Sequence, residues 1–166
     1  MALGPMIVDL TGLTLTDEDH RRLADPMTGG VILFGRNFKN RAQVTKLIRA
    51  IRAIRPNIII SVDHEGGRVQ RFKTDGFAHL PSMRTLGELY AKNPLRALKV
   101  ASQVGYVLAA ELRAVGVDYS YTPVLDLDYG GSTVIGDRAF APSAEVVATL
   151  AKALLHGMLR AGMVGC

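Results

Sequence analysis

Carboxylate and guanidinium side chains gather in one short stretch of the chain, directly after the apolar residues 58–60. The stretch reads Ser61-Val62-Asp63-His64-Glu65-Gly66-Gly67-Arg68-Val69-Gln70-Arg71. A carboxylate accepts hydrogen bonds from hydroxyl groups, and a guanidinium donates hydrogen bonds to hydroxyl oxygens. Both groups at the end of a buried strand therefore indicate a site for a neutral polyol, which favours a sugar.

Five residues are the first candidates for this site. Asp63 lies beside a glycine pair, and we interpret it as a hydroxyl-binding carboxylate rather than a turn cap. Arg71 and Arg138 lie in loops that the predicted fold brings to the same face, although surface arginines are common. His64 could act as a general base, but a single histidine at a strand end is more often a packing residue. Glu65 is expected to accept bonds from the backbone N–H groups of the glycine turn.

A second acidic pair, Asp126 and Asp128, follows the fourth predicted strand. The two side chains point to opposite sides of an extended backbone, so at most one faces the site. Together with Asp63 it could form the carboxylate pair of a glycosidase, which lies ~5–5.5 Å apart in retaining enzymes. His156 falls on a predicted helix and is expected at the surface.

Strand-like and helix-like segments alternate along the chain. Strands are predicted over residues 6–10, 30–34, 57–62 and 117–125, and residues 163–166 are predicted to begin another. Capping residues and breakers delimit the helices between them, namely Thr16 with Asp19, Pro26, Asn40 with Gln43, Pro56, Asn93-Pro94, Gly116, Ser143 and Gly162. Residues 72–90 are predicted as a long loop with one short helix, and residues 129–141 as a glycine-rich loop.

This alternation predicts an α/β fold with a parallel sheet and helices packed outside it. Doubly wound sheets and (β/α)₈ barrels both fit the pattern. No Gly-x-Gly-x-x-Gly follows the first strand and no P-loop is present, which disfavours the nucleotide-binding versions. A barrel needs ~250 residues, so we expect a barrel to have roughly its second half outside these 166 residues.

Composition narrows the function classes further. The net charge of +5 comes from basic residues dispersed over predicted helix faces, and aromatic residues are only 6% with no Trp, so we expect no nucleic-acid partner. The one cysteine, Cys166, cannot form a disulfide within the chain, which suits a reducing compartment. No signal peptide and no apolar run of ~20 residues is evident, so a cytoplasmic protein without membrane contact is predicted.

Five segments resemble glycoside hydrolase family 3, and specifically the bacterial cytoplasmic β-N-acetylglucosaminidases (β-hexosaminidases) of peptidoglycan recycling. They are residues 29–37, 62–72, 80–82, 122–128 and 135–140, in matching order and spacing. The pattern Asp-x-Glu-Gly-Gly-Arg-Val-x-Arg is a specific signal, whereas the strand patterns alone are not.

The resemblance implies a (β/α)₈ TIM barrel in which residues 1–166 form the N-terminal portion of a single domain, about four to five β/α units. It implies that Asp63, Arg71 and Arg138 bind a terminal β-linked N-acetylglucosamine, while Asp126 and Asp128 shape the floor of the pocket. The mechanism implied is retaining, with an aspartate nucleophile and a histidine acid/base, and it needs no metal or cofactor.

The family's Lys-His-x-x-Gly-His-Gly segment, its acid/base histidine and its nucleophile would all fall beyond Cys166. The resemblance therefore replaces the carboxylate pair involving Asp126, assigns no catalytic residue to this chain, and predicts that the chain alone is inactive. Two alternatives stay open. One is a family 3 β-glucosidase, and the other is a non-catalytic sugar-binding half-barrel that associates with another chain or with itself through an open barrel edge.

Overall fold

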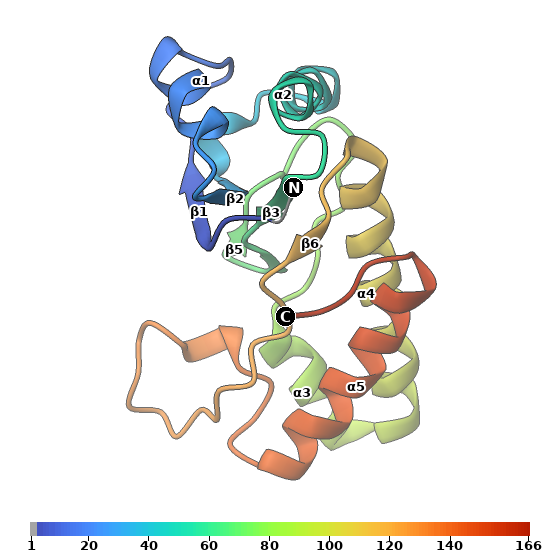
Figure 1. Ribbon diagram of the computed structural model, residues 1–166. Coiled ribbons are helices and arrows are strands. Elements are labelled where there is room, and N and C mark those ends of the chain that lie inside the picture. Colours follow the sequence, from blue (N-terminus) through green and yellow to red (C-terminus); the bar gives the residue numbers. More distant parts are fainter. Residues whose placement is uncertain (1–2) are drawn as a thin grey trace.

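A computed structural model of the protein describes residues 3–166, and its centre is a four-stranded parallel sheet (Figure 1). The strands are β1 (Met6–Asp9), β2 (Thr28–Leu33), β3 (Ile59–Val62) and β6 (Tyr119–Ser120), arranged in the order β1-β2-β3-β6. Strand order thus follows chain order in one direction, as it does around a β/α barrel. A doubly wound sheet reverses direction at its switch point, so this alternative is excluded for the described strands.

The register brings the carboxyl ends of the strands together. Asp9 of β1 lies opposite Ile32 of β2, Leu33 lies opposite Val62 of β3, and Val62 lies opposite Ser120 of β6. Loops that leave these strands therefore meet at one edge of the sheet, where parallel α/β folds place their ligands.

Five α-helices and two short 3₁₀ helices complete the described chain (Figure 1). They are α1 (Asp17–Ala24), η1 (Gly35–Asn37), α2 (Arg41–Ile54), α3 (Met83–Lys92), α4 (Pro94–Val115), η2 (Gly136–Arg138) and α5 (Ala144–Arg160). The predicted caps are confirmed, because the side chains of Thr16, Asn40, Asn93 and Ser143 each accept a backbone N–H from the first turn that follows. Gly116 ends α4 in the left-handed region, with φ of 98°.

Two strand predictions need correction. The fourth strand spans only Tyr119–Ser120 rather than residues 117–125, because its neighbour β3 ends at Val62 and Pro123 has no N–H to donate to a ladder. Residues 163–166 form no strand, although the Cys166 N–H donates to the Thr122 carbonyl at 3.2 Å. A strand pairs only where a neighbour offers a matching edge, which an apolar pattern does not reveal.

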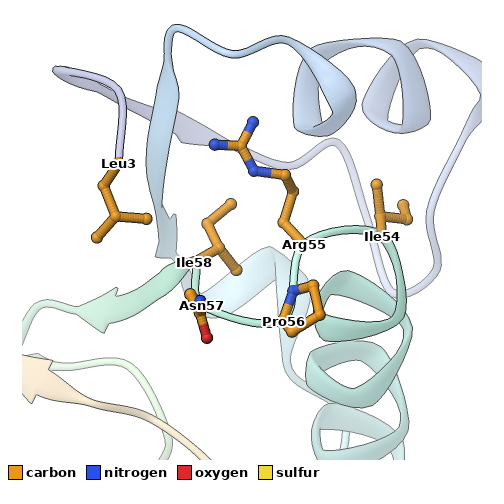
Figure 2. A pocket seen from close by; sticks show the side chains of 6 residues that line it. All are labelled: Leu3, Ile54, Arg55, Pro56, Asn57 and Ile58. Carbon is orange, nitrogen blue, oxygen red and sulfur yellow. The ribbon is translucent and has the colours of Figure 1, made fainter. Parts of the chain in front are cut away.

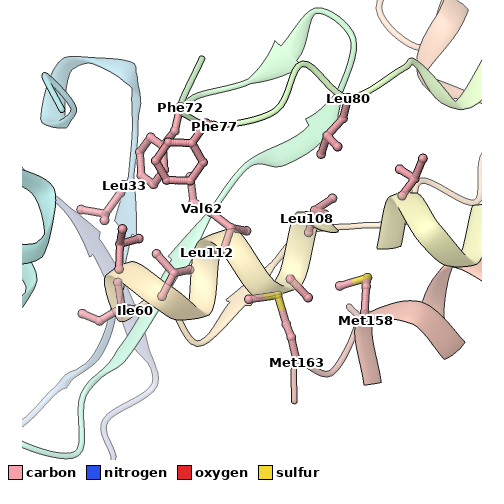
Figure 3. Packing of buried hydrophobic residues seen from close by; sticks show 14 of the residues in the cluster. Leu33, Ile60, Val62, Phe72, Phe77, Leu80, Leu108, Leu112, Met158 and Met163 are labelled. Atoms are coloured by element: carbon pink, nitrogen blue, oxygen red, sulfur yellow. The ribbon is translucent and has the colours of Figure 1, made fainter. Parts of the chain in front are cut away.

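The core lies between the sheet and the long helices (Figure 3). Side chains from the strands, such as Val62, meet Leu108 and Leu112 of α4. The loop after the Asp63–Arg71 stretch adds Phe72 and Phe77, which are 0% and 4% exposed. This loop is therefore anchored by buried aromatic rings and supports the residues that precede it.

Candidate functional site

A β-hairpin carries the acidic and basic stretch at the carboxyl end of β3. Its strands are β4 (His64–Gly66) and β5 (Val69–Gln70), which pair antiparallel and were not predicted from the sequence. Gly66, which ends β4, and Gly67, which begins the turn, have φ of 110° and 55°, and the Gly67 N–H donates to the Leu80 carbonyl at 2.9 Å. The hairpin is thereby held against the loop that leads to α3.

Asp63 and Arg71 form an ion pair across the base of this hairpin. Arg71 Nη2 donates to Asp63 Oδ2 at 3.2 Å, and the two side chains are 30% and 28% exposed. The Arg71 guanidinium also lies 5.7 Å from the centre of the Phe34 ring. Because a carboxylate accepts several hydrogen bonds and a guanidinium has five donors, this partly exposed pair can still bind hydroxyl groups.

Arg138 contacts the same hairpin and forms a bidentate ion pair with Glu65, which lies 73 positions earlier in the chain. Its Nε and Nη2 donate to the two carboxylate oxygens at 3.0 and 2.8 Å. The side chain of Glu65 is 3% exposed, so the carboxylate needs this charged partner. The expectation that Glu65 bonds the glycine-turn backbone was therefore wrong.

Negative charge surrounds the Arg138 guanidinium. Hydrogen bonding to Glu65, followed by the charges of Glu65, Asp63 and Asp126, raises the pKa of Arg138 above its usual value. The structure thus brings the three predicted sugar-binding residues, Asp63, Arg71 and Arg138, to one edge of the sheet.

The acidic pair after β6 divides between two environments. Asp128 is largely buried and forms an ion pair with Arg84 of α3, whereas Asp126 is exposed. Asp128 therefore fixes the loop that carries it, and Asp126 remains accessible near Arg138. Both residues line a hollow of about 280 Å³ beside the glycine-rich loop, so it stays a prediction that at most one of them faces the site.

His64 is fully buried and packs against Phe72 and Phe77, with ring centres 5.7 and 6.0 Å away. Neither ring nitrogen has a hydrogen-bond partner among the described residues. Burial, together with the positive charges of Arg71 and Lys73, lowers the pKa of His64 to about 4. His64 is thus a neutral packing residue at pH 7, and His156 is exposed on α5, as expected.

A hollow of about 250 Å³ lies at the other end of the sheet, beside the amino end of β3 (Figure 2). It is lined by Leu3, Ile54, Arg55, Pro56, Asn57 and Ile58. It contains no carboxylate and lies away from the hairpin. Across residues 3–166 there is no group of three or more His, Cys, Asp or Glu side chains that could hold a metal ion. No helix in this range is long and apolar enough to cross a membrane.

Comparison with known proteins assigns the family. The chain belongs to glycosyl hydrolase family 3, because the Glycosyl hydrolase family 3 N terminal domain matches residues 6–166. A beta-hexosaminidase from Bordetella avium is 59% identical over 98% of this chain and 47% of its own length. One from Aromatoleum aromaticum is 58% identical over 99% of this chain and 46% of its own length.

Solved structures agree with this assignment. NagZ from Neisseria gonorrhoeae, crystallised in complex with N-trifluoroacetyl-D-glucosamine, superposes with a TM-score of 0.96 and 50% identity, over 99% of this chain and 49% of that one. A family 3 beta-N-acetylglucosaminidase from Paenibacillus has a TM-score of 0.86 and 30% identity, over 96% of this chain and 30% of that one. The fold therefore matches the N-terminal half of the TIM-barrel-type domain, and the chain spans about half the length of the curated relatives it matches.

Proposed function

We propose that this chain is the sugar-binding half of a β-N-acetylhexosaminidase, which removes terminal β-linked N-acetylglucosamine. The observation that carries the proposal is the juxtaposition of the Asp63–Arg71 and Glu65–Arg138 pairs at the carboxyl end of β3. Two further findings support it. The chain resembles beta-hexosaminidases, and its fold superposes on a NagZ bound to an N-acyl glucosamine.

In this proposal the chain binds and orients the sugar, and the catalytic pair comes from residues outside 1–166. Asp63 accepts hydrogen bonds from sugar hydroxyl groups, while Arg71 and Arg138 donate to hydroxyl oxygens. Glu65 is already occupied by Arg138 and buried, so it serves to hold that guanidinium. A retaining glycosidase then needs a nucleophile at the anomeric carbon and an acid/base at the leaving oxygen.

The decisive experiment compares two purified forms, residues 1–166 alone and a polypeptide extended past Cys166 by the second half of the barrel. Both are assayed on chromogenic β-N-acetylglucosaminide and β-glucoside. We expect turnover of the N-acetylglucosaminide by the extended form only. Turnover by residues 1–166 alone would show that the catalytic pair lies within this chain. A preference for the glucoside would favour the β-glucosidase alternative.

We further propose a retaining mechanism, a cytoplasmic location and anhydro-muropeptides of peptidoglycan recycling as the natural substrates, all from the family resemblance. The first product anomer seen by proton NMR tests retention, since a retaining enzyme releases the β-anomer first. Accumulation of N-acetylglucosaminyl anhydro-muropeptides in a cytosolic extract of a deletion strain tests the pathway. An unchanged muropeptide pool would contradict it.

A further inference from the structure

Arg68 lies in the turn of the hairpin β4–β5. Its guanidinium forms hydrogen bonds with a loop that is distant in the sequence. Its Nε donates to Asp137 Oδ1 at 2.8 Å. Its Nη2 faces three consecutive backbone carbonyls, those of Thr133, Val134 and Ile135, with the first and third at 3.2 and 3.3 Å. One guanidinium therefore forms hydrogen bonds with both backbone and side-chain atoms of a five-residue stretch, residues 133–137. None of the sequence patterns indicates this contact.

Few other contacts hold the loop of residues 133–137: from α3, the Arg84 Nη2 donates to the Gly136 carbonyl at 3.3 Å. Residues 129–134 are all exposed, and even Val134 is 67% exposed, so apolar burial contributes little. Within the loop, the Ser132 hydroxyl accepts the Ile135 N–H at 3.2 Å and the Ser132 carbonyl accepts the Gly136 N–H at 3.0 Å. Segments with few buried contacts open locally at low cost. The several hydrogen bonds of Arg68, together with the single one from Arg84, are thus the main side-chain contacts between this loop and the hairpin and helix beside it.

Arg138 follows directly on this loop as the last residue of η2. Its Nη1 lies 3.4 Å from the Val134 carbonyl, which Arg68 also contacts. Its other nitrogens bind Glu65, and Glu65 and Arg68 belong to the same hairpin. The hairpin therefore holds the loop at two points, and a shift at the Arg68 point would displace the guanidinium of Arg138.

We propose that Arg68 is a positioning residue, which holds the loop of residues 133–137 so that Arg138 meets the sugar in the right orientation. The inference rests on the proposed function, in which Arg138 contacts the sugar. Arg68 itself reaches the site only through the loop. The planar guanidinium of arginine can donate hydrogen bonds to a carboxylate and to several carbonyls at once, which the single ammonium group of lysine cannot do.

The test measures the inhibition constant of N-acetylglucosamine, together with KM and kcat, in the extended active form. We expect R68M and R138M each to raise the inhibition constant about tenfold or more, since small misplacements of binding groups are costly. In the double variant, R68M should add little to the effect of R138M, because both act through the same guanidinium. R68K should resemble R68M. The control R21M removes an exposed ion pair with Glu18 on α1 and should change nothing.

Each outcome decides the matter. Additive effects of R68M and R138M, or rescue by R68K, would overturn the positioning role. An effect of R138M without one of R68M would overturn it while leaving the proposed function intact. No effect of R138M would contradict both. If R68M fails to fold, D137N removes the charged partner of Arg68, and the same cycle is run with D137N. Additivity of D137N with R138M, or no effect of D137N, would then overturn the role.

Discussion

The buried imidazole of His64 makes the folding stability of the protein sensitive to acid. In the folded protein the pKa of His64 is about 4 instead of 6.5, mainly through burial. The unfolded chain takes up a proton near pH 6.5, whereas the folded protein does so only near pH 4. Folding stability is therefore complete above pH 6.5 and falls as the pH drops from 6.5 towards 4.

This shift corresponds to a loss of up to about 3 kcal/mol in the free energy of unfolding between pH 6.5 and pH 4. Urea unfolding at several pH values measures it. His64→Gln should flatten the dependence in this range, while His156→Gln, on an exposed side chain, should leave it unchanged. An equally steep dependence in His64→Gln would mean that other groups cause it.

Asp63 offers a second prediction at the scale of one residue. Asp63→Ala should weaken N-acetylglucosamine binding in the extended form about ten- to a hundredfold, because a hydrogen bond to a charged group is worth about 1.5–3 kcal/mol. Calorimetric titration measures this loss. Asp118→Ala is the matched control, because Asp118 forms a similarly exposed ion pair with Arg52 (31% and 32% exposed) at the opposite end of the sheet. Equal affinities in the wild type and Asp63→Ala would return Asp63 to a structural role.

Among the elements, the hairpin β4–β5 depends on its glycine turn. A Cβ atom on Gly66 would lie 2.4 Å from the Pro81 carbonyl oxygen, and φ there is 110°. Gly66→Ala should therefore lower the free energy of unfolding by about 2 kcal/mol or more. Gly131→Ala is the control, since a Cβ there would meet no atom within 4 Å. Thermal unfolding of both variants checks this, and equal midpoints would show that the turn tolerates a side chain.

The same elements show which structural features can be predicted from the sequence alone. Helix starts were predictable, because a capping residue such as Thr16 or Asn40 acts on a backbone N–H within three residues. The location of Asp63 and Arg71 was also predictable, since both follow one buried strand. Two contacts could not be predicted, because each joins segments about 70 positions apart. They are the ion pair of Glu65 with Arg138 and the hydrogen bonds of Arg68 to residues 133–137. Only the folded backbone decides which distant loop meets the hairpin.

At the scale of the whole molecule, β1 and β6 are the two outer strands of the sheet, and each leaves one edge unpaired within residues 3–166. Apolar side chains are exposed beside these edges. Met6 and Ile7 on β1 are 54% and 46% exposed, and Leu125 beyond β6 is 59% exposed. Unpaired edges with apolar side chains favour pairing with another chain. In a closed barrel, both edges would be covered by further strands.

Residues 1–166 alone should therefore self-associate, whereas the extended form should not associate through these edges. Light scattering coupled to size-exclusion chromatography measures the mass of each form against the 17.9 kDa of one chain. Ile7→Lys places a charge on the β1 edge and should shift residues 1–166 towards monomer, because edge lysines oppose strand pairing. Leu95→Lys, at an 81% exposed position on α4, should not. A wild-type chain that stays monomeric at high concentration would mean that its edges are protected without the second half of the barrel.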